Sequence, residues 1–591
     1  MRQLGVRELW LTAVVLCFCV PLFVGLGRTD MENDEAIYSY AVDGILATGD
    51  WFNPPLSPHP DWTFLEKPPL KFWIVAAPIA SGLLPHNEIG MRLWDALFGA
   101  MAFVYVFAFG RRLAGPVCGF IAVLVLFLYQ PLLFNHGIRN NNMEAPLVLC
   151  YSGGIYHFAA WASAATRSRR RAHVAAVYAY FFLGFMTKFV AAFFLPVVLC
   201  LGLAVDRSAW RRLREDLRIW LFGALTTLAV AAPWFIYQMR KEGMGFWRVL
   251  VGEHVYQRFT SSLDKSHLQP WHFYFSTVFK ELETSGTVWI VGIGVVLLLI
   301  ALARERKREQ WLAVAWFLAP VGLISLGTSK IHHYVYPFLP PLALAAGFGT
   351  AWLLRVGQRY ATAAIQAVQQ RFGGMQRPSA VRAVLLGVAG LAVVLAVATF
   401  VLGQVEWQVG ETRLFRNSHV ARPLAVAMVL ALIAGRGEMA ARFLWPLALL
   451  LAIVPLNAYE GIWKKAQEEN HPVRTARDCM MRVQQAEREA GRPGPGVYAI
   501  GEHTWFLHTY FYYLRPMGWE RAETVNQRAV DAAMVAPGMQ RPIMMQESAY
   551  NEIRHRYRDI IIPMVPLTTV LLLTPGPYGE CGRQPDPAYA R

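Results

Sequence analysis

The chain has 591 residues, of which 55% are hydrophobic and only 16% are charged, against roughly 25% charged residues in soluble domains. A mean hydropathy of +0.32 over this length requires many apolar segments, which excludes a soluble enzyme and a soluble body with one membrane anchor. The excess of 56 Lys and Arg over 40 Asp and Glu would indicate nucleic acid in a soluble protein; in a membrane protein it first reports topology, and we expect no nucleic-acid partner.

Apolar runs long enough to cross a bilayer recur from the N-terminus to residue 459, and they predict about 13 transmembrane helices. No small-x-small cleavage site follows the first run, so we interpret it as a membrane helix and not as a cleaved signal peptide. The runs lie at residues 10–27, 91–110, 116–133, 144–162, 173–188, 189–205, 219–238, 287–303, 311–327, 334–353, 383–403, 421–435 and 443–459.

The basic residues gather in alternate loops, and this pattern indicates the orientation. With a cytoplasmic N-terminus, the loops on the cytoplasmic side carry 24 Lys and Arg against 7 Asp and Glu, as the positive-inside rule requires. The opposite loops, 28–90 and 239–286 above all, are rich in carboxylates, histidines and aromatic residues. We therefore expect a site on the outer face, within a transmembrane domain over residues 1–459.

From residue 460 the composition changes, because no further long apolar run follows. Short strand-like and helix-like patterns alternate there, which predicts a separate α/β domain over 460–591. An odd number of spans places this domain on the outer, periplasmic face. We expect its strands at Val497–Ile500 and Val570–Leu573 and its helices at Thr504–Leu514 and Glu547–Tyr557.

The seven cysteines contain no CxxC pair and no Cys/His cluster at zinc spacing, so a cysteine-ligated metal is not expected. Five of them lie in apolar segments, where cysteine behaves as a small buried hydrophobe. Cys479 and Cys581 lie in the expected periplasmic domain. Oxidising conditions there permit a disulfide between them, and two free buried thiols are the equal alternative.

Two short motifs in the first external loop carry residues suited to chemistry. Asp34 and Glu35 follow the first span closely; they are either acids in the first turn of a solvated helix or include a general base for an acceptor hydroxyl. Lys67, in Glu66-Lys67-Pro68-Pro69, lies on a stretch that proline keeps stiff and extended. It either binds a phosphate at the bilayer surface or snorkels to the lipid headgroups.

Seven segments in this order carry a resemblance to a known family. They are Asp34-Glu35, Gly49-Asp50-Trp51, Glu66-Lys67-Pro68-Pro69, Arg92-Leu93, Glu253-His254-Val255-Tyr256-Gln257-Arg258-Phe259, Gln269-Pro270-Trp271 and Ser329-Lys330-Ile331-His332-His333-Tyr334-Val335-Tyr336-Pro337. Together they resemble the bacterial members of the protein O-mannosyltransferase superfamily, and among these most of all the aminoarabinose transferases of lipid A. The resemblance covers about residues 10–350.

The resemblance implies a GT-C fold and an inverting hexosyl- or pentosyltransferase of the bacterial inner membrane. Such an enzyme takes a sugar from a polyprenyl (undecaprenyl) phosphate donor and passes it to an envelope acceptor, which is lipid A, a glycolipid or a polysaccharide. By the same resemblance Asp34, with Glu35 beside it, is the catalytic carboxylate. Fixed cations stabilise the charge on a departing phosphate, and the residues expected to bind it are Lys67, Arg258, Lys330, Tyr334 and His333.

One departure from the family pattern concerns Glu144. It stands in Arg139-Asn140-Asn141-Asn142-Met143-Glu144-Ala145-Pro146-Leu147, where many relatives have Arg-x-Asp-x-Pro-Leu. Glu144 is therefore either a second catalytic carboxylate or an acid at a helix N-terminus. Lys188 likewise has two readings, a lysine that snorkels to the interface or a second contact to the lipid phosphate.

No cofactor is certain from the sequence, and a divalent metal is left open. Glu66, Glu253 and His254 are weak candidate ligands, but no tight ligand spacing supports them, and hydrogen-bonded loop residues are the favoured reading. The expected partners are the polyprenyl-phosphate sugar, a lipid or glycan acceptor and membrane lipid, and we expect a monomer.

Three rival functions stay open. One is a protein O-mannosyltransferase-like enzyme, with a protein hydroxyl as acceptor. Another is a transporter or flippase of polyprenyl-linked sugars, although transporters show repeats and mid-membrane ionisable residues, whereas the charges here gather in the outer loops. A non-catalytic scaffold or receptor is the third, and it gives no reason for the carboxylates and cations.

Overall fold

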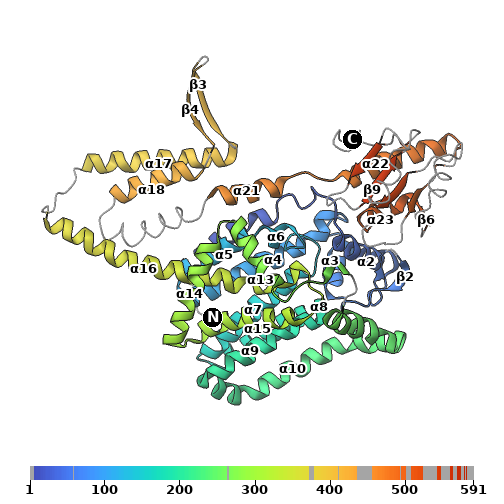
Figure 1. Cartoon of the computed structure of the whole chain (residues 1–591), viewed down its shortest axis with the longest axis horizontal. Helices are drawn as coiled ribbons and strands as arrows, with labels where there is room; N and C mark the ends of the chain where they lie inside the picture. The colour runs from blue at the N-terminus through green and yellow to red at the C-terminus, as the bar shows by residue number, and fades with distance from the viewer. Residues whose placement is uncertain are drawn as a thin grey trace. The chain divides into compact units, whose positions relative to one another are not determined.

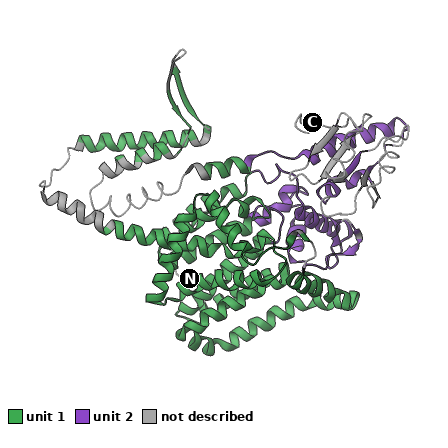
Figure 2. Ribbon diagram, viewed as in Figure 1, with its two compact units in different colours: residues 1–24, 97–138, 144–466 green, residues 25–96, 139–143, 467–591 purple. Residues whose placement is uncertain are grey.

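The computed structural model divides the chain into two compact units, drawn in green and purple in Figure 2. Unit 1 comprises residues 1–24, 97–138 and 144–466, and unit 2 comprises residues 25–96, 139–143 and 467–591. The structure describes residues 6–57, 59–261, 265–371, 379–402, 404–409, 412–418, 420–434, 456–492, 494, 496–500, 508–522, 542–546, 560–563, 569–573, 578 and 581.

Within these residues, six helical stretches are long and apolar enough to cross a membrane: Glu88–Ala114, Arg167–Val205, Arg207–Glu242, Val288–Glu305, Arg308–Leu326 and Ala380–Thr399. A seventh results if the pair His332–Phe338 and Pro340–Gly357, bent by 49°, is one broken span. The predicted helical membrane architecture is confirmed. The total of about 13 spans stays a prediction, and the expected span 443–459 lies largely outside the described residues.

Unit 1 consists mainly of helices, and Figure 1 shows the hairpin of strands β3 and β4 rising from the pair α17 and α18. Its elements are α1 (Val6–Phe18), η1 (Val20–Leu22), α5 (Pro116–Leu128), α6 (Gln130–Phe134), α7 (Glu144–Ser163), α8 (Arg167–Lys188), η2 (Phe189–Phe193), α9 (Phe194–Val205), α10 (Arg207–Glu242), α11 (Met244–Trp247), η3 (Arg248–Gln257), α12 (Arg258–Thr260), η4 (Lys265–His267), α13 (Phe273–Thr284), α14 (Val288–Glu305), α15 (Arg308–Leu326), η5 (His332–Phe338), α16 (Pro340–Arg371), α17 (Ser379–Leu402), β3 (Val405–Val409), β4 (Thr412–Asn417), α18 (Ala421–Ala434) and α21 (Leu456–Gln467), whose last residue begins unit 2.

Local sequence explains how one long apolar stretch becomes separate helices. Helix α8 ends at Lys188 because Phe189 has φ 40°, a left-handed conformation that stops a helix. Helix α10 begins after Asp206, whose carboxylate accepts the backbone N–H groups of Ser208 at 2.8 Å and Ala209 at 3.1 Å, as an N-cap residue does. The predicted runs 173–188 and 189–205 end where α8 and α9 end, although Arg167–Val205 forms one candidate span, and the run 219–238 lies within α10.

Small residues let three helices of unit 1 pack closely. A Cβ added to Gly347 of α16 would lie 2.2 Å from the carbonyl oxygen of Cys118 in α5, and one added to Gly294 of α14 would lie 2.2 Å from that of Ala345 in α16. Close backbone approach of this kind is how membrane helices gain packing contacts. The short helix η5 immediately precedes α16, so this packing also anchors the segment that carries His333 and Tyr334.

Unit 2 combines residues 25–96 and 139–143 with the C-terminal residues. Its five-stranded sheet has the order β6-β5-β7-β9-β8; β5 runs parallel to β6 and β7, and the other pairs are antiparallel. The elements are α2 (Asp34–Thr48), β1 (Pro55–Leu56), β2 (His59–Thr63), α3 (Leu70–Ala80), the start of α4 (Glu88–Ala114), α22 (Pro472–Glu489), β5 (Val497–Ile500), α23 (His508–Leu514), η8 (Arg515–Met517), β6 (Trp519–Ala522), β7 (Ile543–Gln546), β8 (Ile560–Pro563) and β9 (Thr569–Leu573).

One hydrophobic core joins these parts of unit 2, because Val42 of α2 and Phe72 of α3 are buried in the same cluster as Met480 of α22 and Phe511 of α23. A disulfide links Cys479 to Cys581, which decides between the two alternatives left open by the sequence.

The strands expected at Val497–Ile500 and Val570–Leu573 are present. The helix expected at Thr504–Leu514 is described from His508 onward, and the one expected at Glu547–Tyr557 lies outside the described residues. The predicted domain limits stay predictions. The units themselves group residues 28–90 with the C-terminal residues rather than with the transmembrane helices.

Candidate active site

Asp34 and Glu35 are the first two residues of helix α2, where acids interact favourably with the helix dipole. Asn33 precedes them with φ 37° and ψ −106°, an uncommon backbone conformation for a residue other than glycine. The two acids have different surroundings. Asp34 is partly exposed and accepts a hydrogen bond from the Tyr38 hydroxyl at 3.4 Å, whereas Glu35 is 1% exposed.

Glu35 forms a buried ion pair with Arg92. The Nε and Nη2 atoms of Arg92 donate to separate oxygens of Glu35, both at 2.8 Å, and the backbone N–H of Asn141 adds a bond at 2.7 Å. Burial raises the pKa of Glu35, but the opposite charge and hydrogen bonds of Arg92 outweigh it and lower the pKa overall. A carboxylate held this way fits a positioning role better than the catalytic role expected with Asp34.

A second buried pair lies beside the first. Lys71 donates to Asp95 at 2.5 Å and to the Asn141 side chain at 2.8 Å, and the Asn141 amide donates to Ser39 of α2 at 2.9 Å. Lys71 and Asp95 are 1% and 0% exposed, and buried charges of this kind require a partner. We call Asp34, Glu35, Lys71, Arg92 and Asp95 the acid cluster.

Helix α23 holds the backbone in front of Asp34. The Tyr513 hydroxyl accepts from the N–H of Met31 at 3.0 Å, and the Thr509 hydroxyl accepts from the N–H of Asn33 at 3.2 Å. These contacts satisfy backbone donors and support the uncommon conformation of Asn33. The sequence analysis predicted a helix here and gave no sign of these contacts.

His508 of α23 is buried close to the acids of the first loop. Burial lowers its pKa to about 4, against the opposing influence of the Asp34 and Glu66 carboxylates, so the ring is neutral at pH 7. It shares a hydrogen bond of 3.2 Å with the Ser57 hydroxyl. The sequence analysis gave His508 no role, because its distance along the chain from the first loop hides this proximity.

Lys67 lies directly before the two prolines that precede helix α3, as the motif predicted. Its ammonium is 3.4 Å from the Glu66 carboxylate and 5.9 Å from the centre of the Phe64 ring. Its side chain is 13% exposed. This position in the loop does not by itself choose between phosphate binding and contact with the headgroups.

In unit 1, two backbone segments bring Arg258 and Lys330 together. The N–H groups of Thr328 and Ser329 donate to the carbonyls of Phe259 at 3.0 Å and Arg258 at 3.1 Å, and the N–H of Lys330 donates to that of His267 at 2.8 Å. Arg258 follows η3, a π-helix, and π-helical turns are frequent at functional sites. Distant residues of the sequence thus form one local structure.

The charged groups of this structure have mainly neutral partners. Arg258 donates to the Tyr334 hydroxyl, and the Lys330 ammonium donates to the carbonyls of Gln269, at 2.9 Å, and Gly327. Lys330 is 4% exposed, and burial without a carboxylate partner lowers its pKa. Lys330 is in no ion pair among the contacts of the described residues.

Glu144 is the first residue of α7, as one reading of the sequence predicted, and it is buried. It accepts a hydrogen bond from Lys188, and the His333 ring lies 3.6 Å from the same carboxylate oxygen. Lys188 also lies 4.9 Å from the centre of the Tyr334 ring. A pairing with Glu144 was not foreseen for Lys188. We call Glu144, Lys188, Arg258, Lys330, His333 and Tyr334 the cation cluster.

The predicted site residues therefore fall into two groups, each within its own unit. Asp34, Glu35, Glu66 and Lys67 are in unit 2, and the cation cluster is in unit 1 together with Glu253 and His254 of η3. Within the described ranges, no group of three His, Cys, Asp or Glu side chains is arranged to hold a metal ion. The divalent metal left open by the sequence stays untested.

Sequence comparisons relate the chain to prenyl-phosphate sugar transferases. A family model described as dolichyl-phosphate-mannose-protein mannosyltransferase matches residues 66–237. A relative from Pseudomonas fluorescens Pf-5, named undecaprenyl phosphate-alpha-4-amino-4-deoxy-L-arabinose arabinosyl transferase 2, is 26% identical over 318 residues, which are 53% of this chain and 51% of the relative. The transferase of the same name, without the number, from Pseudomonas aeruginosa LESB58 is 26% identical over 339 residues, which are 56% of this chain and 57% of the relative. The chain spans about half the length of these curated relatives.

Solved structures extend the likeness to the fold. The crystal structure of ArnT from Cupriavidus metallidurans bound to undecaprenyl phosphate matches 97% of this chain and 99% of that chain, with a TM-score of 0.57 and 19% identity. The archaeal oligosaccharyltransferase AglB from Archaeoglobus fulgidus matches 96% of this chain and 74% of its own chain, with a TM-score of 0.51 and 10% identity. The chain has the GT-C fold of these proteins, and its resemblance to the protein mannosyltransferase family and to aminoarabinose transferases is confirmed.

Proposed function

We propose that this protein is an inverting glycosyltransferase that moves a sugar from undecaprenyl phosphate to an acceptor of the bacterial envelope, lipid A in the first place. The observation that carries the proposal is its likeness to the undecaprenyl phosphate-aminoarabinose arabinosyl transferases over more than half of this chain. The acid and cation clusters supply the two kinds of group that the reaction needs. The sugar follows from the relatives' names, the acceptor follows from the resemblance of the sequence motifs, and both form part of the proposal.

In the proposed reaction, Asp34 accepts the proton of the acceptor hydroxyl while the acceptor oxygen attacks the anomeric carbon of the donor. The bond from that carbon to the phosphate oxygen breaks, and undecaprenyl phosphate leaves with the electron pair. Asp34 suits the role of general base because it is partly exposed and its proton transfer needs access to the acceptor. Glu35 and Arg92 hold the first turn of α2 in place.

The cations bind the donor phosphate and stabilise the charge that it gains as the bond breaks. Lys330 and Arg258 carry most of this role: the Lys330 ammonium donates to two carbonyl oxygens, and Arg258 donates to the Tyr334 hydroxyl. Arg258 offers the forked donors that suit a phosphate. Tyr334, His333 and Lys67 add hydrogen-bond donors, and Glu144 holds Lys188 beside Tyr334.

We further propose the topology that the charge pattern favours. The chain spans the inner membrane about 13 times, with its N-terminus in the cytoplasm and an α/β domain over 460–591 in the periplasm. The loops assigned to the cytoplasm carry 24 basic against 7 acidic residues, which supports this orientation. We propose that the enzyme acts as a monomer. Whether it uses a divalent metal is left open.

A transfer assay tests the proposal against its rivals. Purified protein is incubated with undecaprenyl phosphate-aminoarabinose and lipid A, and mass spectrometry follows both products. We expect undecaprenyl phosphate and modified lipid A to appear together in equal amounts. A protein or polysaccharide that becomes modified instead of lipid A would correct the acceptor, and movement of intact donor across vesicles without bond cleavage would support a flippase.

The variant Asp34→Asn identifies the base within the same assay. Removal of a positioned general base lowers turnover by about 10²- to 10⁴-fold, while donor binding stays near that of the natural protein. Glu32→Gln is the matched control, because Glu32 is an exposed acid two residues away. Full turnover in Asp34→Asn would remove Asp34 from the mechanism without affecting the phosphate assignment.

A further inference from the structure

Helices α9 and α10 meet in an elbow that contains none of the residues assigned to the reaction. Asp206 is the single residue between the two helices. Its carboxylate caps α10 and accepts from Arg308 of α15 at 2.5 Å, so a hydrogen-bonded ion pair fixes the elbow. The geometry of this corner therefore does not depend on a ligand.

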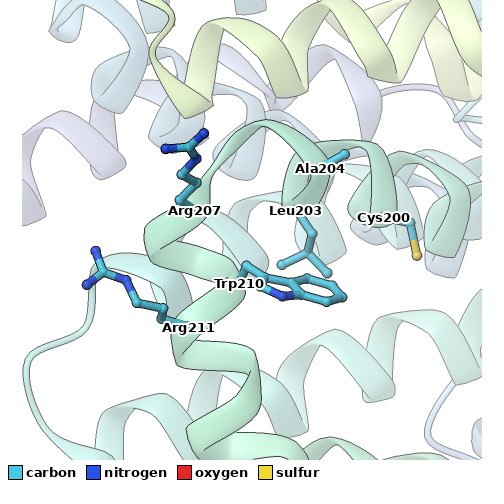
Figure 3. Close-up of a pocket in the computed structure, with 6 residues that line it drawn as sticks. All are labelled: Cys200, Leu203, Ala204, Arg207, Trp210 and Arg211. Atoms are coloured by element: carbon cyan, nitrogen blue, oxygen red, sulfur yellow. The ribbon is translucent and has the colours of Figure 1, made fainter.

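A cavity of about 680 Å³ opens at the elbow. Cys200, Leu203 and Ala204 of α9 line one part of it, and Arg207, Trp210 and Arg211 of α10 line the other (Figure 3). In Figure 3 the Trp210 ring lies beside Leu203, whereas both guanidinium groups extend to the left of α10, away from the ring. The cavity lining thus combines apolar side chains with two cations.

The two arginines of the cavity differ from three basic residues near them. Arg212 donates to the carbonyl of Ala164 at 2.7 Å, Arg170 pairs with Asp216 at 2.6 Å, and Arg308 pairs with Asp206. Arg207 and Arg211 are exposed, and neither has an ion pair or side-chain hydrogen bond among the described contacts; the same holds for Arg214, which lies 5.8 Å from the centre of the Trp210 ring. The nearby acids Asp206, Glu215 and Asp216 pair with Arg308 or Arg170, so no described carboxylate pairs with Arg207 or Arg211.

We propose that this elbow pocket binds an acidic phospholipid. The phosphate of its headgroup lies between Arg207 and Arg211, which are one helical turn apart on α10, and an acyl chain lies along Leu203 and Trp210. Trp210 is 46% exposed, and tryptophan favours the boundary between headgroups and acyl chains. In the proposed orientation the lipid belongs to the cytoplasmic leaflet, whose anionic lipids attract basic segments beside the membrane.

The form of the pocket favours a lipid over a soluble anion. Three of its six lining residues, Cys200, Leu203 and Ala204, are apolar and come from a helix within a membrane-spanning stretch. A free phosphate would gain no binding energy from these apolar residues. A phospholipid can place its acyl chain against them and its phosphate beside the arginines. The residues proposed for the donor phosphate belong to other segments, so this site is separate from the transfer reaction.

Cys200 provides a test in the natural protein, since it is an exposed free cysteine that lines the pocket. Full-length protein in a neutral detergent is treated with a maleimide, with phosphatidylglycerol, phosphatidylcholine or inorganic phosphate added, and peptide mass spectrometry measures the alkylation rate. We expect phosphatidylglycerol alone to slow alkylation of Cys200, about threefold or more at saturation. Cys17, also exposed and free, serves as the internal control.

Three outcomes of this test would overturn the proposal: equal protection by phosphatidylcholine, protection by inorganic phosphate alone, or equal slowing at Cys17. A pair of double variants gives an independent check by native mass spectrometry. Arg207→Ala with Arg211→Ala should weaken retention of phosphatidylglycerol about tenfold or more, and Arg167→Ala with Arg171→Ala, which removes two exposed arginines at the same spacing on α8, should not. Unchanged retention in the first pair, or equal loss in both pairs, would also refute the site.

Discussion

The acid cluster of unit 2 and the cation cluster of unit 1 balance their charges in different ways. In the acid cluster, Glu35 pairs with Arg92 and Lys71 pairs with Asp95, and Asp34 accepts a hydrogen bond from the Tyr38 hydroxyl. In the cation cluster, Lys188 pairs with Glu144, whereas the Lys330 ammonium donates to two carbonyl oxygens. One cluster keeps a net negative charge and the other keeps net positive charge.

This difference shows how buried charge can be divided between structure and chemistry. A buried ion pair fixes geometry, but its charges are neutralised and interact weakly with anything else. A cation held by carbonyl and hydroxyl oxygens keeps its full charge for an anionic ligand. The ion pairs therefore position the clusters, and proton transfer by Asp34 and phosphate binding by Lys330 remain the roles that we propose.

The largest expected loss of stability comes from breaking the buried ion pair between Glu35 and Arg92. Arg92→Met leaves the Glu35 carboxylate buried without its partner, which costs about 3–5 kcal/mol in unfolding free energy. Denaturant unfolding in detergent measures the loss, and Glu35→Gln with Arg92→Met should recover much of it. Arg492→Ala, which removes an exposed pair with Glu487, is the control, and an equal loss there would contradict the interpretation.

The pH dependence sharpens the comparison within unit 2. The pKa of His508 falls to about 4 in the folded protein from an ordinary value near 6.5, so the unfolded chain binds more protons between these values. Its contribution, about 2–3 kcal/mol, is present above pH 6.5 and is lost as the pH falls towards 4. The pKa of Asp30, raised to about 6 mainly by burial, acts in the opposite direction over this range.

The two opposing groups make single variants the informative measurement. The unfolding free energy of His508→Gln should depend less on acid than that of the natural protein between pH 6.5 and 4. Asp30 lowers the unfolding free energy of the natural protein as the pH rises from about 4 to 6, and Asp30→Asn should abolish this decrease. Parallel curves for the natural protein and His508→Gln would show that His508 is not buried as a neutral ring.

The affinity for the donor lipid tests the role of Lys330 in the cation cluster. Lys330→Ala should weaken the affinity for undecaprenyl phosphate about 10- to 100-fold, since a hydrogen bond to a charged group contributes about 1.5–3 kcal/mol. Titration of the lipid followed by fluorescence or calorimetry measures the affinity. Lys280→Ala removes an exposed lysine of α13 and should leave it unchanged; equal weakening in both variants would reduce the effect to bulk charge.

The smallest expected effect concerns the contact between α23 and the residue before Asp34. Thr509→Val removes the hydroxyl that accepts the Asn33 N–H and should cost about 1 kcal/mol of stability. A shift of Asp34 lowers kcat more than it raises KM, which distinguishes positioning from simple destabilisation. Thr509→Ser keeps the hydroxyl and should restore kcat, whereas failure of serine to restore it would assign the effect to packing.

Some of the site was accessible to sequence reasoning because its residues form local motifs. Asp34 and Glu35 lie together at a helix start as expected, and Lys67 lies before a pair of prolines. Their separate environments were not accessible, because burial of Glu35 depends on Arg92 and Asn141 from distant segments. The pair of Lys71 and Asp95 could have been predicted in part, because a charged residue within an apolar segment requires a partner.

By itself the sequence determined the membrane architecture, the family resemblance and the candidate residues, because apolar length, charge asymmetry and short motifs are local properties of the chain. Only the tertiary structure decided that Cys479 bonds to Cys581, that Glu144 pairs with Lys188, and that α23 holds the backbone before Asp34. Those facts depend on which distant side chains fill the space around a buried group. The cost of leaving a buried charge or backbone donor without a partner selects these contacts, and it acts only in the folded chain.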